Sequence, residues 1–412
     1  MGNISTKYWV KVSLLNLLFV AMLGVLMRFK IGFEFPYFSQ RFLHEAHSHF
    51  AFVGWITHTL YVLMINFIQS KIPVIYHKQY KILITANLVC AYGMLISFII
   101  RGYGVVSILF LISTISIACF YAFYFLKDLK KLKGHPGVVW FKSAVWFNII
   151  SALGTFYLAY MLASGNFNEK WYLAAEYFYL HFQYNGFFIF TCMGLAHSQI
   201  QKALPTFKHD KTIFKLFFVS FIPAYFLSIL WAKLPIWLYI IVVISAFVQV
   251  IAWIQFLIII RKSLASKTNL TKLTQYLFLF VAIAFSTKLL LQLGSTIPVV
   301  SKLAFGFRPV VIAYLHLVLL AVISVFLLSY LHAFKLINQN KLSILGLIIF
   351  VAGVFLNELV LAIQGIASFS YMAVPKVNET LFIISLIVMS ALVLLVVSQS
   401  KLVVKSKVSD SV

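Results

Sequence analysis

Residues 309–333 read PVVIAYLHLVLLAVISVFLLSYLHA and contain no Asp, Glu, Lys or Arg. A helix rises about 1.5 Å per residue and the hydrocarbon core of a bilayer is about 30 Å thick, so roughly 20 apolar residues cross it. Because backbone groups in lipid must be paired within their own segment, such a run is a helix. This stretch therefore predicts a transmembrane helix that carries His316 in its first half.

The rest of the chain repeats this pattern. With 309–333, the expected spans are 8–28, 44–69, 80–100, 103–126, 138–164, 171–198, 213–232, 235–260, 274–297, 343–365 and 380–400. The sequence is 63% hydrophobic and only 10% charged, whereas a soluble domain is about half apolar and about a quarter charged. We therefore expect an all-α polytopic membrane bundle of 12 transmembrane helices, with a single membrane domain at 1–402 and a short tail at 403–412.

The Lys and Arg residues that give the net charge of +24 are distributed unevenly among the loops. One alternating set of loops holds 23 Lys and Arg residues and the other set holds 9. Basic loops stay in the cytoplasm, so both chain ends are expected there. The charge matches an anionic lipid surface, and its clustering between apolar runs argues against nucleic acid as a partner.

Polar side chains inside apolar runs are costly in lipid and mark candidate functional sites. The prominent ones are His47 and His49 in the second span, Glu176 and His181 in the sixth, Lys288 in the ninth, His316 in the tenth and Glu358 in the eleventh. For the two glutamates, a proton path and a structural hydrogen bond both remain open. Lys288 either pairs with a buried acidic group or extends toward the membrane surface.

Three of the histidines share a local pattern. His49, His181 and His316 are each followed five residues later by a small residue, Gly54, Gly186 and Ala321, and then by bulky apolar residues. They lie on spans two, six and ten, and fixed spacing of this kind indicates internal repeats. We therefore predict three pseudo-repeats of four helices.

Imidazole is a natural ligand of heme iron and of copper, so His49, His181 and His316 form a candidate metal set. The alternative is three separate buried histidines, each hydrogen-bonded to a neighbour. At about 100° per residue, His47 and His49 point to nearly opposite sides of one helix, so the second span can serve two pockets.

With these residues, the chain resembles subunit I of the heme-copper oxidase superfamily, as a degenerate, stand-alone member of the cbb3 or nitric oxide reductase kind or of the NnrS kind. The resemblance covers the whole chain in architecture but is specific only in the histidine helices. It implies that His47 or His49, with His316, holds a heme b, that Lys288 meets a heme propionate, and that His181 belongs to a second site that could include copper.

The sequence also departs from that family. Residues 213–232 lack the histidine pair of span seven, and span ten has His316 without a second histidine two residues away. The resemblance further implies a bacterial inner (plasma) membrane, and a quinol or an accessory respiratory subunit as partner. Two functions remain open: redox or nitric oxide and oxygen-related chemistry at a heme, and transport of a solute, ion or proton without heme.

Overall fold

Helices make up nearly all of the computed structural model, which describes residues 5–73, 76–203, 211–265 and 270–400. The elements are α1 (Thr6–Gly32), α2 (Gln40–His49), η1 (Phe50–Thr57), α3 (His58–Gln69), α4 (His77–Arg101), α5 (Val105–Leu129), η2 (Lys130–Leu132), α6 (Gly137–Ser164), α7 (Glu169–Leu180), η3 (His181–Phe188), α8 (Ile189–Ala203), α9 (Thr212–Ala224), η4 (Tyr225–Ile229), α10 (Ile236–Ala265), α11 (Lys272–Gly294), α12 (Pro298–Gly306), α13 (Arg308–His316), η5 (Leu317–Ser324), α14 (Val325–Ala333), α15 (Lys341–Phe369) and α16 (Val377–Ser398). The tail predicted at 403–412 lies outside the described residues.

The predicted all-helical architecture is confirmed, and its long apolar helices are consistent with a membrane bundle. Among the described residues, 11 helices are long and apolar enough to cross a membrane. They match the predicted spans, except that the sixth span does not reach this standard. That span is nevertheless one uninterrupted helix made of α7, η3 and α8, and it carries Glu176, His181, Gln183 and Asn185.

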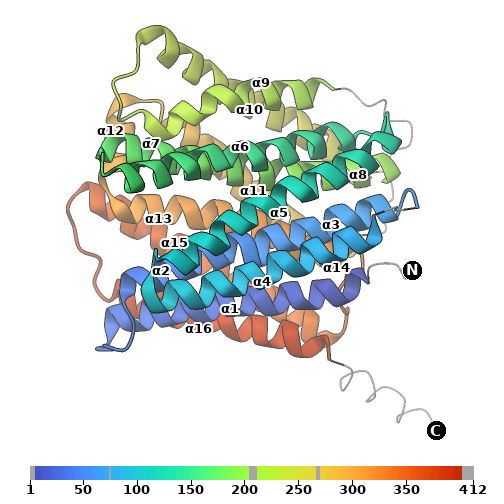
Figure 1. Cartoon of the computed structure of the whole chain (residues 1–412), viewed down its shortest axis with the longest axis horizontal. Coiled ribbons are helices and arrows are strands. Elements are labelled where there is room, and N and C mark those ends of the chain that lie inside the picture. The colour runs from blue at the N-terminus through green and yellow to red at the C-terminus, as the bar shows by residue number, and fades with distance from the viewer. Residues whose placement is uncertain (1–4, 74–75, 204–210, 266–269, 401–412) are drawn as a thin grey trace.

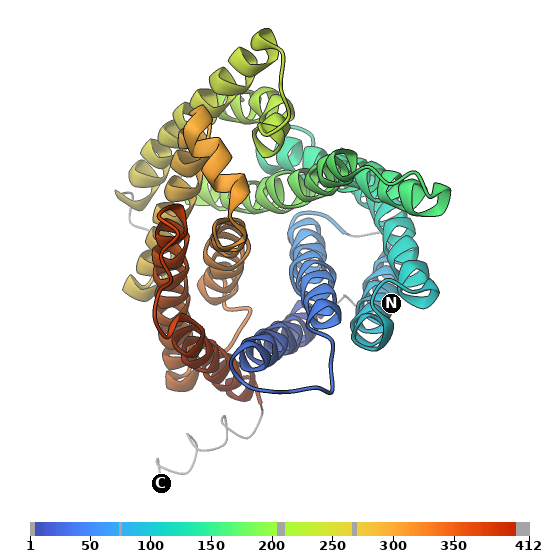
Figure 2. The same ribbon diagram turned by 90° about the vertical axis from the view of Figure 1, so that its left-hand side faces the viewer.

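The long helices run side by side (Figure 1). We call the end of the bundle where α2, α7 and α13 begin the histidine end; α1 begins and α16 ends at the opposite end. Seen from the histidine end, the helices surround a central region (Figure 2). The first and last helices pack against each other, as do α4 with α5, α9 with α10 and α15 with α16.

Three of the helices change their winding in the middle. The segments η1, η3 and η5 are π-helical, and each has eight residues. The first begins just after His49, the second begins at His181 and the third begins just after His316. π-Helical turns are rare and are frequent at functional sites, so the histidine pattern of the sequence coincides with a backbone feature that the sequence analysis did not predict.

Two side-chain amides donate hydrogen bonds to backbone carbonyls of the π-helical segment η1. Asn16 Nδ2 donates to the carbonyl of Gly54 at 2.6 Å, and Asn87 Nδ2 donates to the carbonyl of Val53 at 3.2 Å. The indole of Trp55 in η1 donates to the hydroxyl of Ser324 in η5 at 2.9 Å. The first and third π-helical segments are thus joined directly in the interior of the bundle.

Candidate functional site

His47 is half-buried near the end of α2 and faces α1. Its Nδ1 lies 3.1 Å from the carbonyl oxygen of Val20. Because a carbonyl can only accept, Nδ1 carries the hydrogen, and in the neutral imidazole Nε2 keeps its lone pair. No described residue forms a hydrogen bond with that Nε2. A Cβ added at Gly24 would lie 3.6 Å from the His47 ring, so α1 presents its smallest residue there.

His316 has the same arrangement at the end of α13. Its Nδ1 lies 2.9 Å from the carbonyl oxygen of Ile312, one turn earlier in the same helix. The same reasoning leaves Nε2 with a lone pair, and again that atom has no hydrogen-bond partner in the described part of the chain.

The two imidazoles are electrostatic neighbours. His47 interacts with His316, His44 and Arg28, and His316 interacts with Arg28 and His44. His44 in turn interacts with Arg308. We call His47, His316 and Arg28 the two-histidine site; it combines two free imidazole nitrogens with a guanidinium group.

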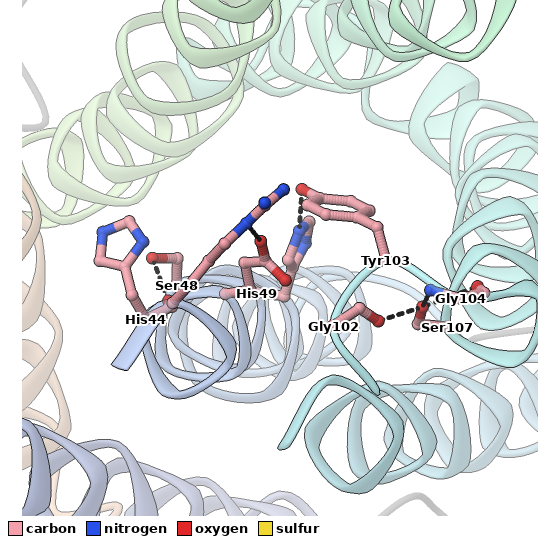
Figure 3. Close-up of polar contacts among 9 residues, drawn as sticks. His44, Ser48, His49, Gly102, Tyr103, Gly104 and Ser107 are labelled. Atoms are coloured by element: carbon pink, nitrogen blue, oxygen red, sulfur yellow. Dashed lines mark hydrogen bonds and ion pairs between the residues drawn. The ribbon is translucent and has the colours of Figure 1, made fainter. Parts of the chain in front are cut away.

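His49 belongs to different surroundings. Its Nε2 lies 2.8 Å from the hydroxyl of Tyr103, and its ring stacks on Phe98 with 4.5 Å between the ring centroids and an angle of 2°. Figure 3 shows His44, His49 and Tyr103 extending into the same region between the helices. The nitrogen that would bind a metal is therefore used in a hydrogen bond.

Tyr103 is held by a tight connection between α4 and α5. Gly102 has a φ of +59°, and a Cβ there would come within 2.6 Å of Phe42 and 2.7 Å of Glu45 Oε2, so only glycine fits. The Ser107 hydroxyl donates to the Gly102 carbonyl at 2.8 Å and accepts from the Gly104 amide at 2.9 Å (Figure 3). The loop fixes the direction in which the phenol points.

Tyr103 is 47% exposed, and its partial burial raises its pKa; nearby Tyr172, Glu45, Tyr179 and Glu176 raise that pKa further. Glu176, a predicted proton-path residue, therefore lies in the neighbourhood of the His49–Tyr103 pair. Glu45 forms an ion pair with the exposed Arg41 at 2.9 Å, while its second oxygen, buried, has no partner among the described residues.

His181, the predicted residue of a second site, is the first residue of η3 and is buried. Its Nε2 is 3.0 Å from the carbonyl oxygen of Phe221, and its Nδ1 is 3.3 Å from Asn185 Nδ2. Both ring nitrogens are thus hydrogen-bonded, and the ring stacks on Phe221 with 4.5 Å between centroids. Lys288 on α11 interacts electrostatically with His181 and is 2% exposed.

The predicted metal set does not assemble as one centre in the described structure. Within residues 5–73, 76–203, 211–265 and 270–400, no three His, Cys, Asp or Glu side chains are grouped closely enough to hold a metal ion. His49, His181 and His316 have separate hydrogen-bond partners, and of the three only His316 is an electrostatic neighbour of His47. Glu358 on α15 is half-buried and accepts from its neighbour Asn357 at 3.2 Å.

Sequence reasoning missed three contributors: Tyr103, Arg28 as a neighbour of both histidines, and Gln249, which lines a cavity beside Lys288. The Gly-Tyr-Gly sequence at 102–104 was the one local signal, because a glycine pair around an aromatic residue favours a constrained turn. Nothing local in the sequence indicates the other two.

Comparison with known proteins adds no assignment. No protein-family model matches the chain, and no curated protein matches it.

Proposed function

We propose that this protein is an integral membrane protein that binds heme b between His47 and His316. The observation that carries the proposal is that both imidazoles donate Nδ1–H to a backbone carbonyl and leave Nε2 without a partner. A metal-ligating histidine usually donates its other N–H in this way, which orients the ring and raises its basicity. Heme held by both imidazoles would supply one-electron redox chemistry.

The surroundings fit such a group. The two imidazoles belong to different helices, α2 and α13, and they interact electrostatically with each other. Gly24 leaves room beside the His47 ring. Arg28 and, through His44, Arg308 supply positive charge that would pair with heme propionates. Lys288 belongs to the surroundings of His181, so the proposal assigns the propionates to arginine and not to Lys288.

Of the two histidines left open on the second span, the proposal selects His47. His49 is the poorer candidate because its Nε2 is hydrogen-bonded to Tyr103. Copper is not part of the proposal, since His181 has no free ring nitrogen and has no two further ligands grouped with it among the residues that the structure describes.

We further propose that the bundle consists of three pseudo-repeats of four helices. Support comes from the equal length and matching position of η1, η3 and η5. Helix packing also repeats at intervals of four spans: α4 with α5, α9 with α10 and α15 with α16 on the one hand, and α1 with α16, α5 with α6 and α10 with α11 on the other. This organisation agrees with a degenerate relative of oxidase or nitric oxide reductase subunit I.

The cellular setting follows as part of the same proposal. The bacterial inner membrane is what the resemblance implies. Both ends are placed in the cytoplasm because the basic loops lie at the end opposite the histidine end. Electrons would reach the heme from a quinol or from an accessory respiratory subunit, since the chain has no Cys-x-x-Cys-His attachment site for a second, covalent heme.

The decisive experiment compares wild type with His316→Ala, purified from cells supplied with heme. A reduced-minus-oxidised spectrum and a pyridine hemochrome assay are expected to show about one heme b per wild-type chain and to show its loss in the variant. His332→Ala is the matched control, because His332 lies on the same continuous helix but contacts Thr274 at the opposite end. A wild-type protein without a Soret band would refute the proposal.

A second candidate, transport of an ion or proton without heme, is favoured by one observation: Lys288 is buried without an ion pair among the described residues. Flux in liposomes from heme-free protein, lost in Lys288→Met, would support that function over the first.

A further inference from the structure

A small cavity in the bundle interior is lined by polar groups from three helices. It has a volume of about 20 Å³ and is bordered by Asn185 of η3, Gln249 of α10 and Lys288 of α11. The rest of its wall is apolar: Ile189, Phe190, Phe217, Phe221 and Phe285. A cavity needs roughly 10–15 Å³ to hold one water, so this one has room for a single water-sized molecule.

Lys288 has hydrogen-bonding capacity that the described residues leave unused. Its side chain is 2% exposed, and its nearest recorded partner is the ring of Phe285, 5.5 Å from Nζ to the centroid. No carboxylate in the described part of the chain pairs with it. A buried amine in this condition is costly unless its hydrogens find acceptors.

Asn185 supplies a matching acceptor. Its orientation follows from His181: Nε2 must donate to the Phe221 carbonyl, so Nδ1 of the neutral ring is an acceptor and receives Asn185 Nδ2–H. The Asn185 oxygen is then left over. It is buried and has no partner within hydrogen-bond distance among the described residues, although the Asn185 amide also interacts with Tyr184. Among the described residues, the side chain of Gln249 makes one long hydrogen bond, 3.5 Å from Nε2 to the Ser220 carbonyl.

We propose that this cavity is a binding site for one ordered water that accepts from Lys288 and donates to Asn185 Oδ1, with Gln249 as third partner. Buried waters typically make about three such bonds to groups that would otherwise be unpaired. The water completes a hydrogen-bonded chain from Lys288 through Asn185 to His181. A small anion fits less well, because the orphaned atom that faces it is an acceptor oxygen. The inference does not depend on heme binding.

The test is a structure of the full-length protein at a resolution that shows waters, determined once in chloride and once in bromide. The expected result is one peak about 3 Å from Lys288 Nζ and from Asn185 Oδ1, with no anomalous signal in bromide. A bromide peak would assign the site to an anion, and an empty cavity would show that the amine is not hydrated; either result overturns the proposal.

Two variants sharpen the test. Asn185→Leu removes the acceptor and is expected to lose the peak, whereas Gln292→Leu, one turn along α11 and not in the cavity wall, is expected to keep it. Retention of the peak in Asn185→Leu contradicts the assigned role of Asn185. If that variant does not fold, the two wild-type maps still decide the proposal.

Discussion

The Nε2 atom of His49 lies 2.8 Å from the hydroxyl oxygen of Tyr103. Two residues earlier on the same helix, His47 directs Nδ1 to a backbone carbonyl instead. Opposite faces of α2 therefore present two imidazoles of different availability: Nε2 of His49 is hydrogen-bonded to a phenol, and Nε2 of His47 is free to bind a ligand. This difference separates a structural histidine from a candidate cofactor ligand.

The first prediction concerns this pair. His47→Ala is expected to abolish heme b binding because it removes the proposed ligand atom, the free Nε2. His49→Ala should retain most of the heme because it removes a hydrogen bond to Tyr103 and no proposed ligand atom. Heme per chain, measured by pyridine hemochrome on detergent-purified protein, distinguishes them. Equal heme loss in both variants would contradict the assignment of His47.

Tyr103→Phe is predicted to destabilise the protein without loss of heme. The substitution keeps the ring that packs on Phe98 but leaves His49 Nε2 without its partner, at a cost of about 0.5–1.5 kcal/mol. The effect is measured by thermal unfolding, with loss of monodispersity as the readout. Phe178→Leu, which alters ring packing on Phe182 and Tyr225 and removes no hydrogen bond, serves as a comparison for general loss of packing. A large drop in heme content in Tyr103→Phe would place Tyr103 in the cofactor site instead.

Gly154→Ala is predicted to weaken the packing of α6 on α7. An added Cβ would lie 2.6 Å from the carbonyl oxygen of Ala175 and 2.9 Å from the backbone nitrogen of Tyr179, and backbone atoms cannot move aside without shifting the helix. We expect a loss of about 1–3 kcal/mol in stability. Gly294→Ala, where a Cβ meets nothing within 4 Å, is the control and should be neutral or slightly stabilising. Similar unfolding temperatures for both variants would show that the α6–α7 contact tolerates a methyl group.

The proposed orientation in the membrane is tested with reporter fusions. A green fluorescent protein joined after residue 412 should fluoresce, because it folds in the cytoplasm, and an alkaline phosphatase inserted in the 165–168 connection should be active outside. Phosphatase activity from a fusion after residue 412 would reverse the orientation, and with it the side of the membrane that the two-histidine site faces.

The sequence determined the helices and their number closely, because crossing lipid depends on local composition: about 20 apolar residues in a row suffice whatever their neighbours are. It also singled out the polar side chains on which the proposals rest, since His47, His181, Lys288 and His316 lie in otherwise apolar runs and are costly in lipid. The helices that carry His49, His181 and His316 also carry the π-helical segments η1, η3 and η5, which the sequence did not predict.

Only the tertiary structure decided which histidine nitrogen is free. That property depends on partners distant in sequence, such as Val20 for His47, Tyr103 for His49 and Phe221 for His181, and on the direction in which each imidazole turns. A helical wheel places His47 and His49 on opposite faces but cannot say what each face meets. Hydrophobic length is a local property of the chain, whereas hydrogen-bond partnership is a property of the packed helices, and the candidate site rests on the second.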